Sequence, residues 1–202
     1  MVRARLSLLP LLAFLLFVSA CGGSGGGLAG LPSVGRVRVM MEGEGGAPIT
    51  QFGASISLSQ SATGAENGAD ATVLQGNMLR LAGEPFTPTS LLLGFDQPTG
   101  MDPVFLSLPP GRRVVGWMRL FAQDEAGEEL ADLVFFGPGV ELLVPLTPDT
   151  SPGQMLEVGE VRSGRVHLAG IVAVVEDGQP FPLARFVVGN PGTFVVLAPS
   201  AP

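Results

Sequence analysis

The 202-residue chain contains one cysteine, one histidine, one tryptophan and no lysine or tyrosine. One histidine and one cysteine cannot supply the four ligands of a tetrahedral zinc site. The Cys-x-x-Cys-His signature of haem attachment and the Gly-x-Ser-x-Gly turn of serine hydrolases are both missing. A serine triad would need His167 as its base, and no motif marks its partners, so we interpret His167 as structural or solvated. These absences predict a protein without a cofactor, a zinc or haem site, or a catalytic centre.

Basic residues are few. Eleven arginines stand against eighteen acidic residues, which gives a net charge of −7. Removal of Arg3 and Arg5 with an N-terminal signal would leave nine arginines and a net charge of −9. A protein of this charge is repelled by phosphate backbones and by anionic lipid head groups. Nucleic acid is therefore excluded as a partner.

Helical patterning is also missing. No window of about a dozen residues shows the apolar spacing of an amphipathic helix. Glycine, with 29 residues, and proline, with 18, make up nearly a quarter of the chain. This density interrupts helices and suits short strands joined by turns, while the aliphatic content is too high for a disordered chain. The sequence therefore predicts an all-β fold.

The first twenty residues have the layout of a secretory signal. Arg3 and Arg5 precede residues 6–18, which are apolar except for Ser7. This run is shorter than the roughly 20 residues that a membrane-spanning helix needs. A short basic region, an apolar run and small residues before a cleavage point are typical of a signal peptide. We therefore assign residues 1–20 to a signal peptide.

The signal ends in Val18-Ser19-Ala20-Cys21, which resembles the lipobox of bacterial lipoproteins. The resemblance implies cleavage after Ala20 and a lipid on Cys21 that anchors the protein to a membrane of the cell envelope. The alternative, an ordinary signal followed by a chance cysteine, would leave a free thiol in an oxidising compartment. Residues 22–33 are rich in glycine and predict a flexible tether. Gly22 stands where aspartate retains lipoproteins of enteric-type bacteria at the inner membrane, so the resemblance implies the outer membrane.

Short apolar runs separated by turn residues fill residues 34–146. Val37 and Val39 alternate with arginines, and Ile56 and Leu58 alternate with serines, as in a half-buried opening hairpin. Regular short strands with turns between them indicate an antiparallel sandwich or barrel. The further strands are expected at residues 72–81, 90–95, 104–108, 113–123, 130–136 and 140–146.

Two motifs resemble known bacterial surface domains. Residues 105–115, Phe-Leu-Ser-Leu-Pro-Pro-Gly-Arg-Arg-Val-Val, resemble an element of prealbumin-like and immunoglobulin-like domains. Residues 35–39, 46–48 and 54–58 resemble the opening hairpin of carboxypeptidase-regulatory-like domains. The resemblance covers residues 34–146 and implies a non-catalytic antiparallel β-sandwich. The sequence departs from the pattern at Arg112 and Arg113, where an aromatic residue is usual.

Residues 147–153, Thr-Pro-Asp-Thr-Ser-Pro-Gly, have the composition of a linker. Apolar segments at residues 155–161, 165–175, 182–188 and 193–197 follow, so residues 154–202 are expected to form a β-rich C-terminal module. Because about fifty residues seldom fold as a separate sandwich, this module is expected to pack on the first domain or to extend its sheets. Residues 164–168 echo residues 35–39, either as a weak internal repeat or as a chance likeness of two glycine-rich hairpins.

One expected strand carries the only tryptophan. Along it, Val114 and Met118 fall on one face, and Trp117, Arg119 and Phe121 fall on the other. Either Trp117 and Phe121 are covered, by another sheet or by residues 154–202, or they form an exposed patch suited to a glycan or peptide. We favour the covered arrangement, and keep Trp117, Arg119 and Phe121 as the candidate binding face.

The densest group of carboxylates is expected in a turn. It could in principle bind calcium, but it lacks the alternating acids of an EF-hand loop, so a solvated turn is favoured. Acidic residues could also supply the acid pair of a glycosidase, although among eighteen acids some pair is inevitable. The weak calcium candidates are Asp124, Glu125, Glu128, Glu129 and Asp132.

The function predicted from these observations is a non-enzymatic binding or structural role at the cell envelope, with another envelope protein or a glycan as partner. One alternative is a carboxylate-dependent hydrolase of envelope polysaccharide, which needs two carboxyl groups roughly 5–9.5 Å apart in an open groove. Another is a surface assembly or adhesin subunit, which needs an unpaired edge strand that accepts a partner.

Overall fold

The computed structural model describes residues 34–40, 51–59, 68–81, 90–96 and 107–200. The predicted signal peptide, lipobox and tether, together with part of the strand expected at residues 104–108, lie outside these ranges. No helix within the described ranges has the length and apolarity needed to cross a membrane. The strands that the structure describes are β1 (Val34–Met40), β2 (Ile56–Ser57), β3 (Asp70–Val73), β4 (Met78–Leu81), β5 (Ser90–Asp96), β6 (Arg112–Gln123), β7 (Leu133–Phe136), β8 (Val140–Pro145), β9 (Met155–Arg162), β10 (Arg165–Glu176), β11 (Leu183–Val188) and β12 (Gly192–Pro199).

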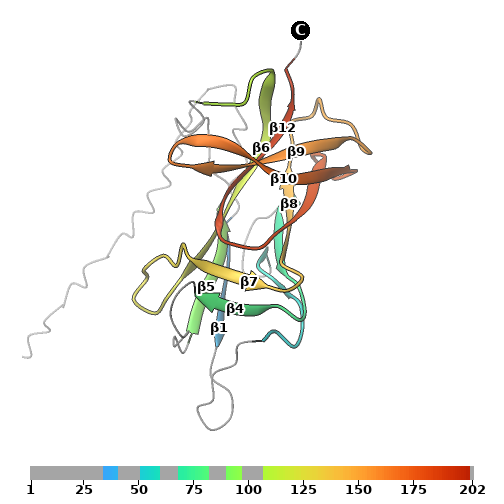
Figure 1. The fold of residues 1–202 in the computed structure, drawn as a ribbon. Coiled ribbons are helices and arrows are strands. Elements are labelled where there is room, and N and C mark those ends of the chain that lie inside the picture. The colour runs from blue at the N-terminus through green and yellow to red at the C-terminus, as the bar shows by residue number, and fades with distance from the viewer. Residues whose placement is uncertain (1–33, 41–50, 60–67, 82–89, 97–106, 201–202) are drawn as a thin grey trace, which may run out of the picture.

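Ten of these strands form one antiparallel sheet, in the order β1-β5-β6-β12-β9-β10-β11-β8-β3-β2. The remaining two, β4 and β7, pair with each other in a small second sheet (Figure 1). The predicted all-β, antiparallel fold is therefore confirmed. Most expected strands lie within one to three residues of the observed ones, because turn residues separate their apolar runs.

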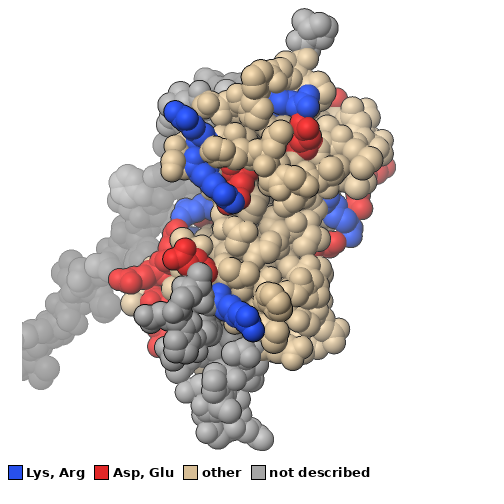
Figure 2. Space-filling view, viewed as in Figure 1, with Lys and Arg blue, Asp and Glu red and all other residues tan. Residues whose placement is uncertain are grey.

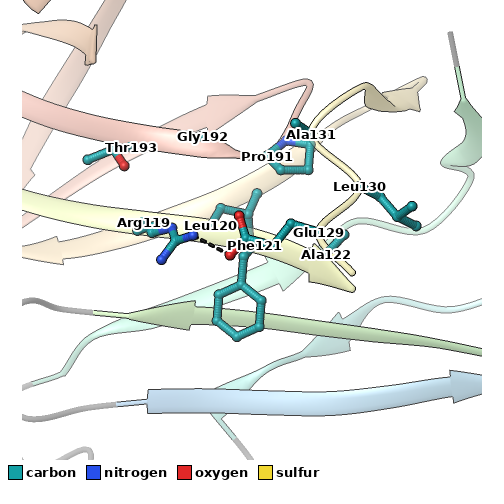
Figure 3. A pocket seen from close by; sticks show the side chains of 10 residues that line it. All are labelled: Arg119, Leu120, Phe121, Ala122, Glu129, Leu130, Ala131, Pro191, Gly192 and Thr193. Atoms are coloured by element: carbon teal, nitrogen blue, oxygen red, sulfur yellow. Dashed lines mark hydrogen bonds and ion pairs between the residues drawn. The ribbon is translucent and has the colours of Figure 1, made fainter. Parts of the chain in front are cut away.

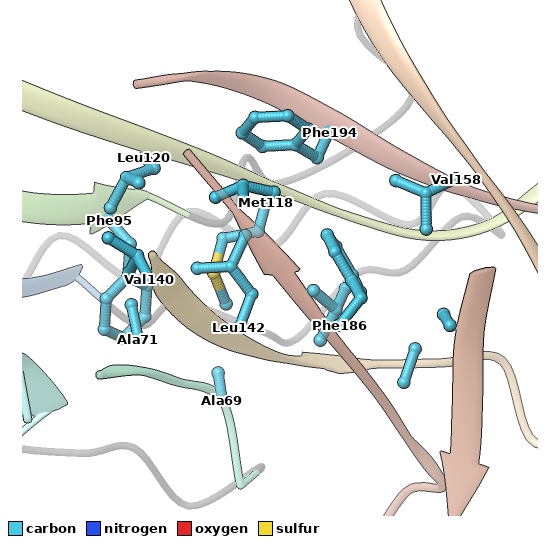
Figure 4. Packing of buried hydrophobic residues seen from close by; sticks show 14 of the residues in the cluster. Ala69, Ala71, Phe95, Met118, Leu120, Val140, Leu142, Val158, Phe186 and Phe194 are labelled. Atoms are coloured by element: carbon cyan, nitrogen blue, oxygen red, sulfur yellow. The ribbon is translucent and has the colours of Figure 1, made fainter. Parts of the chain in front are cut away.

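The large sheet curls so that distant strands approach one another. A Cβ added to Gly35 in β1 would lie 2.7 Å from the carbonyl oxygen of Leu58, which follows β2 at the opposite end of the strand order. The amide of Thr147, after β8, donates to the carbonyl of Val115 in β6 at 2.8 Å. The inner face of the curl encloses the main hydrophobic core (Figure 4). There Phe186 and Phe194 meet edge to face, with ring centroids 6.3 Å apart.

Strands from both sides of residues 147–153 share this sheet and this core. β11 pairs with β8, and β12 lies between β6 and β9. Thr150 is buried within the 147–153 segment, and its hydroxyl donates to the carbonyl of Thr147 at 2.8 Å. The C-terminal strands therefore build the middle of the sheet, and they position the surfaces described below.

The expected opening hairpin is wrong. β1 pairs along its whole length with β5, and β2 pairs with β3. The ring of Phe95 in β5 lies over Gly35, its direct partner in β1, where an added Cβ would be 2.1 Å from a ring carbon. The ring of Phe95 is buried over Gly35, which favours pairing of β1 with β5. The residues next to β1 in the sequence do not indicate this pairing. The two segments of the weak repeat also differ, since β1 ends the sheet and β10 lies within it.

The strand expected at residues 72–81 is divided into β3 and β4 by a turn. Gly76 in this turn has φ of +87°, a conformation that favours glycine. The buried side chain of Asn77 fixes the turn by donating to the carbonyls of Leu74 and Gly139, at 2.8 and 2.6 Å. It also accepts from the amide of Gly139 at 2.8 Å. The turn between β3 and β4 is thereby tied to the start of β8.

A β-bulge changes the facing of the first residues of β6. Val196 of β12 lies opposite Gly116, and Leu197 lies opposite Val114, so Val115 has no partner on β12. A bulge of this kind shifts the alternation of side chains by one residue. The bulge lies where β6 contacts the end of β8, since a Cβ added to Gly116 would be 2.6 Å from the backbone oxygen of Pro145.

The bulge corrects the predicted faces of β6. Val115 lies in the main core together with Met118. Val114 lies on the other side, against the cluster that contains Trp117. The prediction that Val114 shares a face with Met118 is therefore wrong, while the facing of Trp117 and the residues after it is as expected.

Candidate binding surfaces

The predicted aromatic face is covered in the structure. Trp117 and Phe121 are each 5% exposed. Trp117 packs with Val166 of β10 and with Val195 and Leu197 of β12. Residues of the C-terminal segment thus cover the tryptophan, which is the arrangement that the sequence favoured. Neither aromatic side chain offers a free surface to a ligand.

The ring of Phe121 packs across neighbouring strands. Its direct partner in β5 is Gly94, where an added Cβ would lie 2.4 Å from the ring Cζ. The guanidinium carbon of Arg36 in β1 lies 5.4 Å from the ring centroid, within the range of a cation–π contact. Arg36 also lies 3.9 Å from the carboxylate of Asp96. Phe121 therefore holds β1, β5 and β6 together.

Arg119, the third residue of the predicted face, lines a small hollow at the edge of β6 (Figure 3). The hollow has a volume of about 90 Å³. Glu129 forms an ion pair with Arg119 at its mouth, and Thr193 is the cross-strand partner of Arg119 on β12. The structure thus brings together one residue of the predicted face and one of the predicted acidic turn. The hollow is lined by Arg119, Leu120, Phe121, Ala122, Glu129, Leu130, Ala131, Pro191, Gly192 and Thr193.

The hollow offers little chemistry. Glu129 is the only acidic residue in its lining, and its charge is balanced by Arg119. Glycosidic cleavage needs two carboxyl groups on either side of the bond, and this hollow holds one. The ion pair instead reinforces the connection after β6, where the amide of Leu130 donates to the carbonyl of Ala122 at 2.9 Å. We interpret the hollow as a structural junction.

The acidic turn after β6 is organised by hydrogen bonds. The carboxylate of Asp124 accepts the amide of Glu128 at 2.9 Å, and its backbone carbonyl accepts the amide of Gly127 at 3.2 Å. Among the described residues, which include all five calcium candidates, no three His, Cys, Asp or Glu side chains are placed to hold a metal ion. Asp124 accepts hydrogen bonds within its own turn and Glu129 pairs with Arg119, so the geometry adds no support to the weak calcium interpretation of Asp124, Glu125, Glu128, Glu129 and Asp132.

A row of exposed aliphatic side chains lies on the outer face of β9 and β10. Val174 pairs directly with Met155, and Leu168 pairs with Gly159 in the same antiparallel ladder. Directly opposed residues of two strands project from the same face of the sheet. The exposed fractions are 71% for Met155, 53% for Leu168, 49% for Val172 and 45% for Val174. We call these four residues the β10 strip.

The strip differs from the rest of the strand pair. The alternate residues Leu156 and Val158 of β9 are buried in the main core, so β9 and β10 have one face in the core and one in solvent. A half-exposed antiparallel pair normally carries polar side chains on its outer face. Figure 2 shows uncharged surface over much of the region of β9 and β10, with arginine and acidic side chains beside it. On the same face, Val172 lies opposite Glu157, which pairs with Arg112 at 2.6 Å, so the exposed aliphatic side chains stand beside a charged pair. Exposed apolar side chains that gather on one face, rimmed by polar residues, favour contact with another molecule.

Beside the strip, part of one edge of β10 pairs with no described strand. β9 pairs with β10 from Arg165 to Val174, but β11 pairs with it only from Val174 to Glu176. In the described part of the chain, residues 168–172 of β10 therefore have a strand neighbour on one side only. Gly170, with φ of +70°, lies in a bulge within this stretch. The edge is bounded by Ser107, whose carbonyl accepts the amide of Val166 at 3.1 Å.

Among the described residues, the charged side chains near this edge differ in their ion pairing. Glu160 pairs with Arg162 at 2.6 Å and raises the pKa of that guanidinium. His167 is exposed and lies opposite Glu160 in the ladder. Arg165 is exposed and has no ion pair, hydrogen bond or ring contact from its side chain among the described residues. Among the described residues, Arg165 therefore has no acidic partner.

Sequence reasoning did not find the β10 strip. Residues 171–175 read Ile-Val-Ala-Val-Val, and a continuous apolar run of this length is typical of a strand buried on both faces. Met155 alone could not have indicated an exposed face, because a single methionine occurs both in cores and on surfaces. The signal that could have found the strip is the pairing of this run with Leu-Glu-Val-Gly-Glu in β9, whose alternation shows that one face is solvated.

Comparison with known proteins gives no further guide, since no protein-family model, curated protein or solved structure matches the chain.

Proposed function

We propose that the chain is a lipoprotein of the bacterial cell envelope that is anchored through Cys21 and binds another envelope protein through the β10 strip. The observation that carries the binding role is the exposure of Met155, Leu168, Val172 and Val174 on one face of a well-packed sheet. The anchor is carried by the sequence Val18-Ser19-Ala20-Cys21, and the outer membrane is the expected location.

The composition of the strip favours a protein partner over a glycan. Aliphatic side chains bury surface against other apolar side chains, whereas glycans are contacted by aromatic faces and hydrogen-bonding groups. The aromatic residues on the predicted face, Trp117 and Phe121, are covered. The remaining polar candidate, Arg119, is engaged with Glu129. The strip is therefore the surface that best fits the non-enzymatic role.

Site-specific photo-crosslinking in native envelopes tests this proposal. A photoreactive residue at Val172 should give one discrete crosslinked protein species, and the same residue at the exposed Glu128 in the turn after β6 should not. The double variant Val172→Asp, Val174→Asp should remove the species when the photoreactive residue is placed at Met155. Unfolding temperature, measured alongside, identifies any variant that merely fails to fold.

Two outcomes would count against the proposal. One is equal crosslinking at Val172 and Glu128, because a specific surface must discriminate between them. The other is turnover of an envelope polysaccharide by the purified protein that is abolished by Glu129→Gln, because the single acid in the hollow would then belong to a catalytic site.

A further inference from the structure

We infer that the partner of the β10 strip is a basic protein surface, which presents a lysine or an arginine beside its own aliphatic side chains. This inference rests on the proposed binding role of the strip and specifies the chemistry of the partner. The juxtaposition that carries it is the row of exposed aliphatic side chains next to two carboxylates, those of Glu141 and Glu176, that share the guanidinium of Arg185.

The exposed apolar surface continues from the strip onto β11. Val174 of the strip lies directly opposite Arg185. Val187 follows Arg185 by two residues and therefore projects from the same face of β11. It is 40% exposed, whereas the alternate residues Ala184 and Phe186 are buried in the main core. A partner on this face therefore meets aliphatic side chains on two sides of Arg185.

Arg185 holds two carboxylates at once. Its Nη1 lies 3.2 Å from a carboxylate oxygen of Glu141 in β8, and its Nε lies 2.9 Å from one of Glu176 at the end of β10. The hydrogen bond to Glu176 is the main cause of a raised pKa of the guanidinium, and the charges of both carboxylates add to it. One positive charge shared by two negative charges leaves an excess negative charge beside the strip.

No other arginine offsets this excess. Every arginine after Arg5 lies in the described ranges, and among these only Arg185 pairs with Glu141 or Glu176. The chain has no lysine. The sequence therefore offers no arginine or lysine that could come from residues 41–50, 60–67, 82–89 or 97–106.

The border of the strip on β9 is neutral by comparison. There Val172 lies opposite Glu157, whose carboxylate pairs with Arg112 at 2.6 Å. One carboxylate and one guanidinium balance each other at this border. The excess negative charge therefore lies on the β11 side, and it orients a partner so that its cation meets Glu141 or Glu176.

Charge complementarity selects the partner for a physical reason. Contact with an apolar or acidic surface would desolvate the excess carboxylate without compensating its charge, which opposes binding. A lysine or arginine of the partner compensates it. The net charge of −7 of the whole chain also attracts basic surfaces, over a screening length of about 8–10 Å at moderate salt.

Photo-crosslinking through Val172 in isolated envelopes tests the inference when it is measured at several NaCl concentrations. Glu141→Gln combined with Glu176→Gln removes both charges and keeps the size of the side chains. This variant should lower the yield of the crosslinked species about two- to fivefold at about 50 mM NaCl, where screening is weak, and it should reduce the dependence of the yield on salt.

Two matched variants control for net charge and for sign. Glu128→Gln combined with Asp132→Asn gives the same change in net charge at exposed residues between β6 and β7, and it should leave the yield unchanged. Arg185→Gln removes the shared cation instead and should raise the yield. The unfolding temperatures of all variants should stay close to that of the wild type, because the ion pairs of Arg185 are largely exposed.

The outcomes separate the inference from the binding role on which it rests. A carboxamide variant that matches the wild type in yield and in salt dependence would overturn the basic partner, and so would a lower yield from Arg185→Gln. In either case a discrete species crosslinked at Val172 would leave the binding role intact. Absence of any discrete species from wild-type envelopes would reject the binding role itself.

Discussion

The ring of Phe121 lies over Gly94, its direct cross-strand partner, so that β5 and β6 approach without a side chain between them. A Cβ on Gly94 would be 2.4 Å from the ring Cζ and 2.7 Å from the carbonyl oxygen of Gly35. Both contacts are shorter than any that real Cβ atoms make. The aromatic ring therefore occupies the space that the glycine provides, and the outer face of the sheet depends on this pair.

Gly94→Ala is expected to destabilise the protein by about 1–3 kcal/mol, the usual cost of forcing extra volume into a packed site. The free energy of unfolding from urea titration measures this effect. Gly53→Ala is the matched control, because no atom lies within 4 Å of its added Cβ, and it should change stability by less than about 0.5 kcal/mol. Equal effects of the two substitutions would show that Phe121 does not fill the space at Gly94.

Asn77 is a second position where a single side chain holds distant segments. It is fully buried, and its amide group makes hydrogen bonds to Leu74 and Gly139 on two different turns. Asn77→Leu should destabilise the protein by about 2–4 kcal/mol, because it leaves the buried amide and carbonyl of Gly139 without this partner. Urea unfolding measures the loss, with Gln75→Ala in the same turn as an exposed control. A cost below about 1 kcal/mol would mean that water replaces the side chain.

A substitution of Trp117 tests whether this side chain only packs in the sheet or also takes part in binding. Because Trp117 fills the cluster of Val166, Val195 and Leu197, Trp117→Ala should cost about 3–5 kcal/mol of stability. At a temperature where the variant is still folded, crosslinking through Val172 should be retained, since Trp117 is not part of the β10 strip. Loss of crosslinking in a variant of unchanged stability would return Trp117 to the binding surface.

The sequence was informative about where strands lie and much less so about which strands pair. Turn residues delimit β5 and β10 closely, because apolar periodicity and glycine or proline act over a few residues. The pairing of β1 with β5 depends on the fit of Phe95 over Gly35, which no local pattern encodes. Val114 faces away from Met118, contrary to the prediction, because a bulge forms where β6 meets β8.

For the candidate site too, local patterns indicated some features, while contacts between distant residues could not be predicted. Burial of Trp117 was favoured from the sequence, because an aromatic pair beside core residues seldom faces water. The contact of Arg119 with Glu129 was not anticipated, since the two residues belonged to separate predicted sites. The exposure of Val172 and Val174 arises because only the opposite face of β10, with Ala173 and Val175, packs in the core, a tertiary feature that apolar composition cannot reveal.

The pH dependence of stability should contain a contribution from Asp149. The Thr147 hydroxyl and the Arg113 guanidinium beside this carboxylate lower its pKa from the ordinary value of 3.8. A carboxyl group with a lowered pKa in the folded state stabilises the protein above its unfolded pKa, and this stabilisation is lost as the pH falls below about 3.8. Because the side chain is 57% exposed, the contribution should be below about 1 kcal/mol and should decrease with salt.

The contribution of Asp149 is measured as the difference in unfolding free energy between the wild type and Asp149→Asn, from pH 7 to pH 2.5. The variant should be slightly less stable at pH 7, and the two proteins should converge at the acidic end. A difference that grows as the pH falls would contradict the assignment, because it would require a raised pKa. Asp177→Asn, at an exposed acid with no ion pair among the described residues, controls for the replacement of a surface carboxylate by an amide.

Cys21 carries the prediction on which the cellular location depends. As the only thiol in the chain it has no intramolecular disulfide partner, so Cys21→Ala removes the lipid site without disturbing a structural bridge. The variant should retain its signal peptide and lose incorporation of a clickable fatty acid. Ser24→Ala, three residues away, should be processed and labelled like the wild type. An N-terminal tryptic peptide of the wild-type protein that begins at residue 21 without added acyl mass would rule out the anchor, because two acyl chains are what makes such attachment stable.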